Sequence, residues 1–251
     1  MSLLKQVIAI TNNDKSFEFY IEYVKYANLG VRKKSHTALN RFIEIAENWD
    51  YEKRKKFCID ILSLRESLEG KYHLSNFILN QKILLPTLIE YTQLEPNNYI
   101  PFHHIALLMS ENHSYELLIE LVPELDEDGF LFHNKALELN PLDHEIRAYI
   151  ICRLIDSCGY YPTHHLPKFY VQDWNNTPQC DLDYLIENFT KHIDFLPDNK
   201  QKDNFINAYK YYVQLISDYI AFKNSKEEDF TKFTAKLNRD YHWVDTYYYE
   251  K

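Results

Sequence analysis

The feature that most constrains the fold is a helix stop that occurs twice. Residues 136–141 read Ala-Leu-Glu-Leu-Asn-Pro, and Leu94-Glu95-Pro96 repeats the end of this pattern upstream. Proline has no amide hydrogen, and its ring clashes with the preceding helical turn. Each proline therefore marks the end of a helix that is rich in apolar side chains. The pattern predicts helices that stack on one another, and it does not indicate a reaction.

Apolar residues recur at spacings of three and four along almost the whole chain, as on one face of an α-helix. We therefore predict an all-α fold. Ser35, Asp50 and Asp181 stand where they would cap helices. The expected apolar stripes and helices fall at residues 17–24, 39–46, 57–64, 84–94, 100–109, 115–122, 130–139, 143–157, 182–193, 200–222 and 227–237. We expect the aromatic tail, residues 241–249, to pack back onto the last two helices.

Helices that follow one another in pairs and end in Leu-x-Pro make residues 82–158 resemble a tetratricopeptide array. The period is irregular, because the two stops lie 45 residues apart whereas tetratricopeptide units recur at about 34. The resemblance implies antiparallel helix pairs stacked as an irregular α-solenoid. Residues 136–183, with Tyr-x-Thr-His-His-Leu-Pro after the stop, are also similar to uncharacterised bacterial helical-repeat proteins. That similarity implies a bacterial origin and carries no function.

The chain accordingly divides into four predicted parts. They are an N-terminal helical bundle or cap (1–70), degenerate repeat-like helix pairs (71–158), an aromatic and proline-rich connector (159–180), and C-terminal helices packed on the array (181–251). The sequence leaves open whether the first part is a separate domain or the leading cap of the solenoid.

The composition excludes several chemistries. The four glycines are far apart, whereas phosphate-binding loops and the nucleophile elbow of hydrolases need glycines a few residues apart. The four cysteines form no Cys-x-x-Cys pair, so we expect reduced thiols and no disulfide framework. No apolar run reaches the length of a membrane span. We expect a cytoplasmic protein without a cofactor.

Acidic residues are concentrated in the middle of the chain. The net charge is −9, and residues 71–198 hold 19 acidic and only 7 basic side chains. This excess argues against nucleic acid and favours a basic protein partner, although acidic helices also serve simply to keep a protein in solution. The basic runs Arg32-Lys33-Lys34 and 53–56 have acids nearby, so we interpret them as solvent-facing helix surfaces.

The candidate binding residues lie in two segments. Aromatic residues gather among prolines and histidines outside any helical stripe in residues 160–174, a composition found at binding hot spots. An acidic loop precedes them. The candidates are Tyr160, Tyr161, His164, His165, Tyr170, Asp173, Trp174, Asp126, Glu127 and Asp128. The alternative, that 160–174 is a connector packed over the core, stays open.

The paired histidines are candidates either for binding a metal or for packing in the core. His164 and His165 with Asp173 or Asp181 would suit a transition metal, but no His-x-x-x-His spacing is present. The pair at 103–104 lies inside an amphipathic helix. For each pair we expect one histidine to be buried and the other exposed. Asp126-Glu127-Asp128-Gly129 has its glycine too early for a calcium loop. We predict no metal.

The sequence favours a noncatalytic protein-binding module. Its most specific form is an immunity or antitoxin-like protein that sequesters a basic partner such as a nuclease toxin, because the acidic segment would complement a cationic face. One alternative is a metal-dependent hydrolytic enzyme that uses His164 and His165. Another is a general peptide adaptor of the tetratricopeptide type. We expect neither nucleic acid nor membrane as a partner, and the sequence leaves the oligomeric state open.

Overall fold

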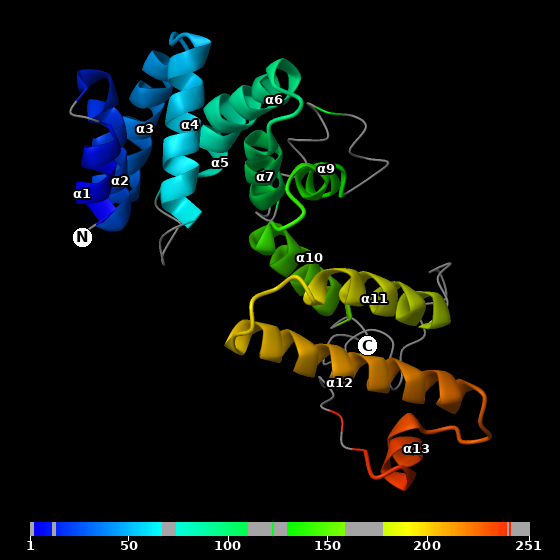
Figure 1. Ribbon diagram of the computed structural model, residues 1–251. Helices are drawn as coiled ribbons and strands as arrows, with labels where there is room; N and C mark the ends of the chain where they lie inside the picture. The colour runs from blue at the N-terminus through cyan, green and yellow to red at the C-terminus, as the bar shows by residue number, and fades with distance from the viewer. Residues whose placement is uncertain are drawn as a thin grey trace. The chain divides into compact units, whose positions relative to one another are not determined.

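The computed structural model describes residues 3–11, 14–66, 74–109, 122, 130–158, 178–239 and 241. Helices make up the secondary structure of these residues, and no strand occurs among them (Figure 1). The predicted all-α class is confirmed. The chain divides into two compact units, Met1–Pro141 and Leu142–Lys251. The division falls directly after the second helix stop, a boundary that the sequence alone did not single out.

The N-terminal unit consists of short and medium-length helices. They are α1 (Leu3–Ile10), the 3-10 turn η1 (Lys15–Phe17), α2 (Glu18–Asn28), α3 (Arg32–Ala46), α4 (Tyr51–Glu66), α5 (Phe77–Leu79), the π-helical turn η3 (Asn80–Leu84), α6 (Leu85–Leu94), α7 (Tyr99–Leu108) and α9 (Leu131–Leu139). Neighbours in the chain pack on each other: α2 contacts α3, α6 contacts α7, and α9 contacts α7.

Both predicted stops end helices in the structure, since α6 finishes at Leu94 and α9 at Leu139. Asp50 caps α4 as predicted, because its Oδ1 accepts a hydrogen bond from the Lys53 amide at 2.8 Å. The other two predicted caps are wrong. Ser35 lies buried inside α3, and Asp181 lies inside α11 (Pro178–Ile193).

Gly30 explains why α3 begins earlier than predicted. Its φ of +70° is in the left-handed region, which ends α2 at little cost because glycine has no Cβ. The chain then enters α3 at Arg32, three residues before Ser35. In α11 the helix begins on Pro178, whose fixed φ suits the first helical position.

Aromatic rings form the core of the N-terminal unit. Phe57 lies between Tyr20 and Phe42, with both centroid distances 5.1 Å, and Phe17 and Trp49 lie 5.7 and 5.8 Å from it. We call these five rings the aromatic cluster. It joins η1, α2, α3 and α4, and its ring pairs add to the free energy gained by burying apolar area.

The C-terminal unit contains α10 (His144–Cys158), α11, α12 (Lys200–Lys223) and α13 (Phe230–Lys236). Ile151, Phe189, Ile193 and Leu196 are buried together, and the Tyr209 ring stacks on Phe189 at 3.9 Å. The first residue of the expected tail packs as predicted, since Tyr241 stacks on Phe230 and its hydroxyl donates to Asp218. Residues 242–249 lie outside the described residues.

Within the described ranges, every helix falls short of the length or apolarity that a bilayer crossing requires.

Candidate functional site

The binding residues predicted from the sequence all lie outside the described residues. These are Tyr160, Tyr161, His164, His165, Tyr170, Asp173, Trp174, Asp126, Glu127 and Asp128. The hydrolytic alternative depends on the same two histidines. The pocket among the described residues is lined by side chains that the sequence did not mark as binding residues.

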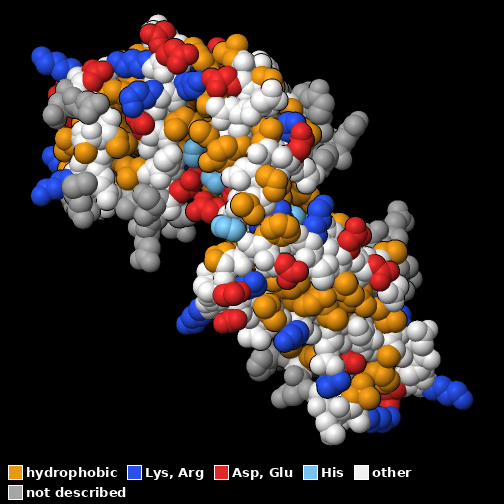
Figure 2. Space-filling model, viewed as in Figure 1, with side chains coloured by type: hydrophobic (Ala, Val, Ile, Leu, Met, Phe, Trp, Pro, Cys, Tyr) orange, Lys and Arg blue, Asp and Glu red, His pale blue; other side chains and the backbone are white. Residues whose placement is uncertain are grey.

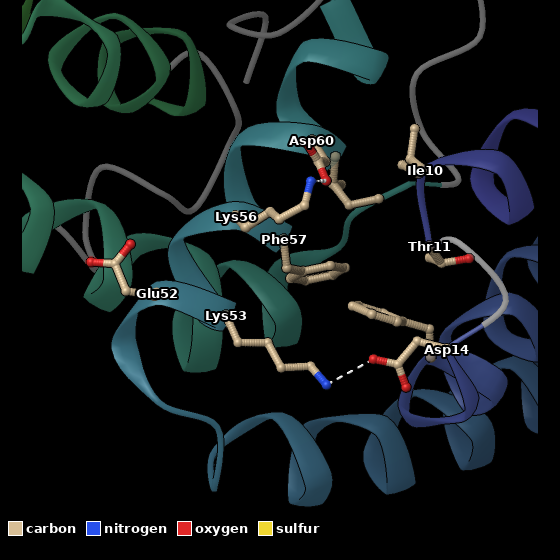
Figure 3. Close-up of a pocket in the computed structure, with 10 residues that line it drawn as sticks. Ile10, Thr11, Asp14, Glu52, Lys53, Lys56, Phe57 and Asp60 are labelled. Atoms are coloured by element: carbon tan, nitrogen blue, oxygen red, sulfur yellow. Dashed lines mark hydrogen bonds and ion pairs between the residues drawn. The ribbon is translucent and has the colours of Figure 1, made fainter.

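A pocket of about 400 Å³ lies in the N-terminal unit where α1 and η1 meet α4. It is lined by Ile10, Thr11, Asp14, Phe17, Glu52, Lys53, Lys56, Phe57, Asp60 and Ile61. Figure 3 shows Ile10 and Thr11 on one side, with Phe57, Lys53 and Asp60 on the side that faces them and Glu52 pointing away. The surface inside the pocket is mostly apolar, although five of its ten lining residues carry a charge. Its volume is in the range of pockets that hold small molecules or single side chains.

The spacing of residues along α4 produces this lining. The cap at Asp50 sets where α4 begins. Residues four apart on a helix share a face, so Lys53, Phe57 and Ile61 all point toward α1 and η1. Phe57 and Ile61 are buried and form the floor, because they also belong to the core. The pocket is thus held open by side chains that the fold already fixes.

One ion pair closes part of the rim. Lys53 Nζ lies 2.9 Å from Asp14 Oδ2 (Figure 3), and it also lies over the rings of Phe17 and Trp49 at 5.5 and 4.8 Å. The hydrogen bond from Lys53, with one from the Ser16 amide, lowers the pKa of Asp14 to about 2. The carboxylate therefore stays charged through the physiological pH range, and the lysine is held between it and two aromatic faces.

The charged lining residues form two lysine–aspartate ion pairs, and one further acid leaves the rim with a small negative charge. Lys56 pairs with Asp60 at 2.7 Å, as Lys53 pairs with Asp14. Glu52 is the remaining charged lining residue, and its exposed side chain lies apart from these pairs in Figure 3. The Glu52 carboxylate points away from Ile10 and Thr11 in Figure 3, so a basic group that pairs with it would lie outside the pocket.

The basic run 53–56 is only partly the solvent-facing surface that the sequence suggested, because Lys56 is exposed whereas Arg54 and Lys55 are largely covered. Arg54 donates to Glu90 at 3.0 Å and to the Trp49 carbonyl at 2.8 Å. Lys55 pairs with Glu95 and lies 4.1 Å above the Tyr91 ring. These bases therefore hold α4 against α6.

These ion pairs also reduce the acidic excess of the central segment. Glu90 and Glu95 belong to residues 71–198 and are neutralised by α4. On the face in Figure 2, acidic and basic side chains are interspersed over the N-terminal unit. In the C-terminal unit, Asp183 and Glu187 are exposed on α11 beside Tyr184, which is 51% exposed. Part of the acidic segment thus remains accessible to a partner.

A second cluster in the N-terminal unit corrects the histidine prediction. His103 and His104 of α7 are both buried, at 9% and 3% exposure, where one was expected to be exposed. Both face Glu66, the last residue of α4. Its Oε1 lies 3.3 Å from Nε2 of His103 and 2.7 Å from Nδ1 of His104. Burial raises the pKa of Glu66, but the two histidines outweigh it and lower the pKa to about 2.

The C-terminal unit contains a buried cation. Arg147 is 6% exposed, its Nη1 donates to the Lys191 carbonyl at 3.2 Å and lies 3.1 Å from Nδ1 of His192, and its guanidinium stacks on Phe195 at 3.8 Å. Burial, and then the charge of Arg147, lower the pKa of His192 to about 4. The imidazole is therefore neutral at pH 7, and this group joins α10 to the end of α11.

Comparison with protein-family models, curated protein sequences and solved structures found no match to this chain.

Proposed function

We propose that this chain is a noncatalytic protein-binding module whose N-terminal pocket takes an apolar side chain of a basic partner segment. The observation that carries the proposal is the preformed pocket, whose floor of Phe57 and Ile61 belongs to the core. A pocket fixed in this way loses little conformational entropy on binding, which favours affinity. We propose further that the helices stack as an irregular array of the tetratricopeptide type, which would present such a pocket on a long surface.

The basic character of the partner is supported by charge at two places. The pocket rim has Glu52 outside its two lysine–aspartate pairs. In the other unit, α11 exposes Asp183 and Glu187. Complementary charge speeds association and excludes acidic competitors. An immunity or antitoxin-like role, with a cationic toxin as the partner, is the most specific form of the proposal.

Selection from a random peptide library displayed on phage tests this function and requires no candidate partner. The library is selected on the full chain, and the enriched peptides are then measured on the Ile10→Lys variant, which places a cation in the apolar pocket. Leu29→Lys is the matched control, because Leu29 is 63% exposed and does not line the pocket. Circular dichroism and tryptophan fluorescence check that both variants fold.

We expect the enriched peptides to share a large apolar residue next to lysine or arginine. They should bind the wild type and Leu29→Lys equally and bind Ile10→Lys at least about tenfold more weakly. Their affinity should fall as salt rises, since the rim interactions are screened. Peptides that bind Ile10→Lys as well as the wild type, or a selection without enrichment, would refute the proposal.

A further inference from the structure

We propose that Glu66, His103 and His104 bind one divalent transition-metal ion of the zinc type. Their three ligand atoms all lie within 4.8 Å of one another, and they come from the end of α4 and from the middle of α7. Imidazole nitrogens with a carboxylate oxygen are a ligand set that zinc, nickel and copper prefer. This site is separate from the pocket, and the inference does not depend on the proposed function.

The contact between His104 and Glu66 has the length of a hydrogen bond but not its alignment. Nδ1 of His104 lies 2.7 Å from the carboxylate oxygen, yet this buried nitrogen makes no hydrogen bond. A proton or lone pair on Nδ1 lies in the plane of the imidazole ring. Because no hydrogen bond forms, that direction does not point at the Glu66 oxygen. A metal ion between the three ligand atoms would lie along that direction and accept the lone pair of Nδ1.

The charges of the group also favour a dication. The Glu66 carboxylate faces two buried imidazole rings that lie 5.2 Å apart. One divalent ion would balance the carboxylate and use a lone pair of each histidine.

The two distances to Glu66 require only a small adjustment. Zinc bonds of about 2.0–2.2 Å in a tetrahedral site place ligand atoms about 3.3–3.5 Å apart. The 3.3 Å between His103 and Glu66 already fits, whereas the 2.7 Å contact must open. Glu66 is the mobile partner, because its side chain is 24% exposed and α4 ends at this residue. The two imidazole nitrogens lie at most 4.8 Å apart, so where they exceed about 3.5 Å one ring of α7 must also turn toward the ion.

Metal binding would fix the end of α4 to α7 and so stabilise the N-terminal unit. Three protein ligands leave a fourth position for water, as in zinc sites that are not fully closed. The metal adds to stability by mass action, because the unfolded chain does not hold these ligands together.

Calorimetric titration of the chelator-treated full chain with Zn²⁺ tests the proposal. We expect one tight site per chain, a higher melting temperature with zinc, and visible absorption of four- or five-coordinate Co²⁺ when cobalt replaces zinc. Glu66→Gln, which keeps the shape of the side chain and removes its charge, should weaken Zn²⁺ binding more than tenfold. His36→Gln is the matched control, because His36 is exposed and outside the cluster; it should bind like the wild type.

Equal Zn²⁺ affinity of the wild type and Glu66→Gln would overturn the assignment, as would loss of the site in His36→Gln. A wild type without a stoichiometric site would do the same. If Glu66→Gln does not fold, the cobalt spectrum of the wild type decides, since the weak absorption of solvated six-coordinate Co²⁺ contradicts a site made of two histidines and a carboxylate.

Discussion

Phe57→Ala should destabilise the N-terminal unit strongly, because Phe57 is both the floor of the pocket and the centre of the aromatic cluster. The side chain is 3% exposed and has four ring neighbours at 5.1 to 5.8 Å. Its burial is worth about 2–3 kcal/mol. The lost ring contacts and the cavity raise the expected cost to about 3–5 kcal/mol.

Urea unfolding followed by Trp49 fluorescence measures this cost. Trp49 reports on the cluster directly, since its ring is 5.8 Å from Phe57. The background variant carries Trp174→Phe and Trp243→Phe, so that Trp49 is the one tryptophan that remains. Phe57→Leu is the control, because it keeps most of the volume and should cost about half as much. A loss below about 1 kcal/mol for Phe57→Ala, with an unchanged denaturant slope, would show that the cluster does not hold the pocket open.

Three further predictions concern single contacts. Asp50→Ala removes the cap that accepts from the Lys53 amide and should cost about 1 kcal/mol in the same urea experiment; an unchanged midpoint would contradict the cap. His192 has a folded pKa lowered to about 4, so the unfolded state binds more protons between about pH 4 and 6.5. The stability of the C-terminal unit, followed by hydrogen exchange of α10 and α11 amides, should therefore rise with pH across that window by at most about 3 kcal/mol, and His192→Asn should flatten the rise. Arg147→Met should raise the pKa of His192 in an NMR titration and cost about 2–4 kcal/mol, because the Lys191 carbonyl loses its charged donor; a pKa that stays near 4 would mean that burial alone sets it.

Local signals in the sequence predicted the helices well. The stop prolines and the cap at Asp50 act through neighbouring residues, so they could be read directly. Ser35 was assigned wrongly because Gly30 ends one helix and permits the next to begin at once. The competing signal is present in the sequence at Gly30, because glycine permits the left-handed conformation that ends a helix.

The candidate sites depend on contacts that spacing does not show. The pocket joins Ile10 to Ile61, far along the chain, through the packing of α1 against α4. His103 and His104 point in different directions along their own helix. They converge only because the end of α4 places Glu66 beside both.

The central claim is that an apolar side chain of a partner enters the pocket between α1 and α4. Photo-crosslinking tests it most directly: a selected peptide carries a photoreactive group on its apolar residue, and mass spectrometry identifies the residues it labels. The account predicts labels on the pocket lining, at Ile10, Phe57 and Ile61 or their immediate neighbours. Labels confined to other surfaces of the chain would contradict it.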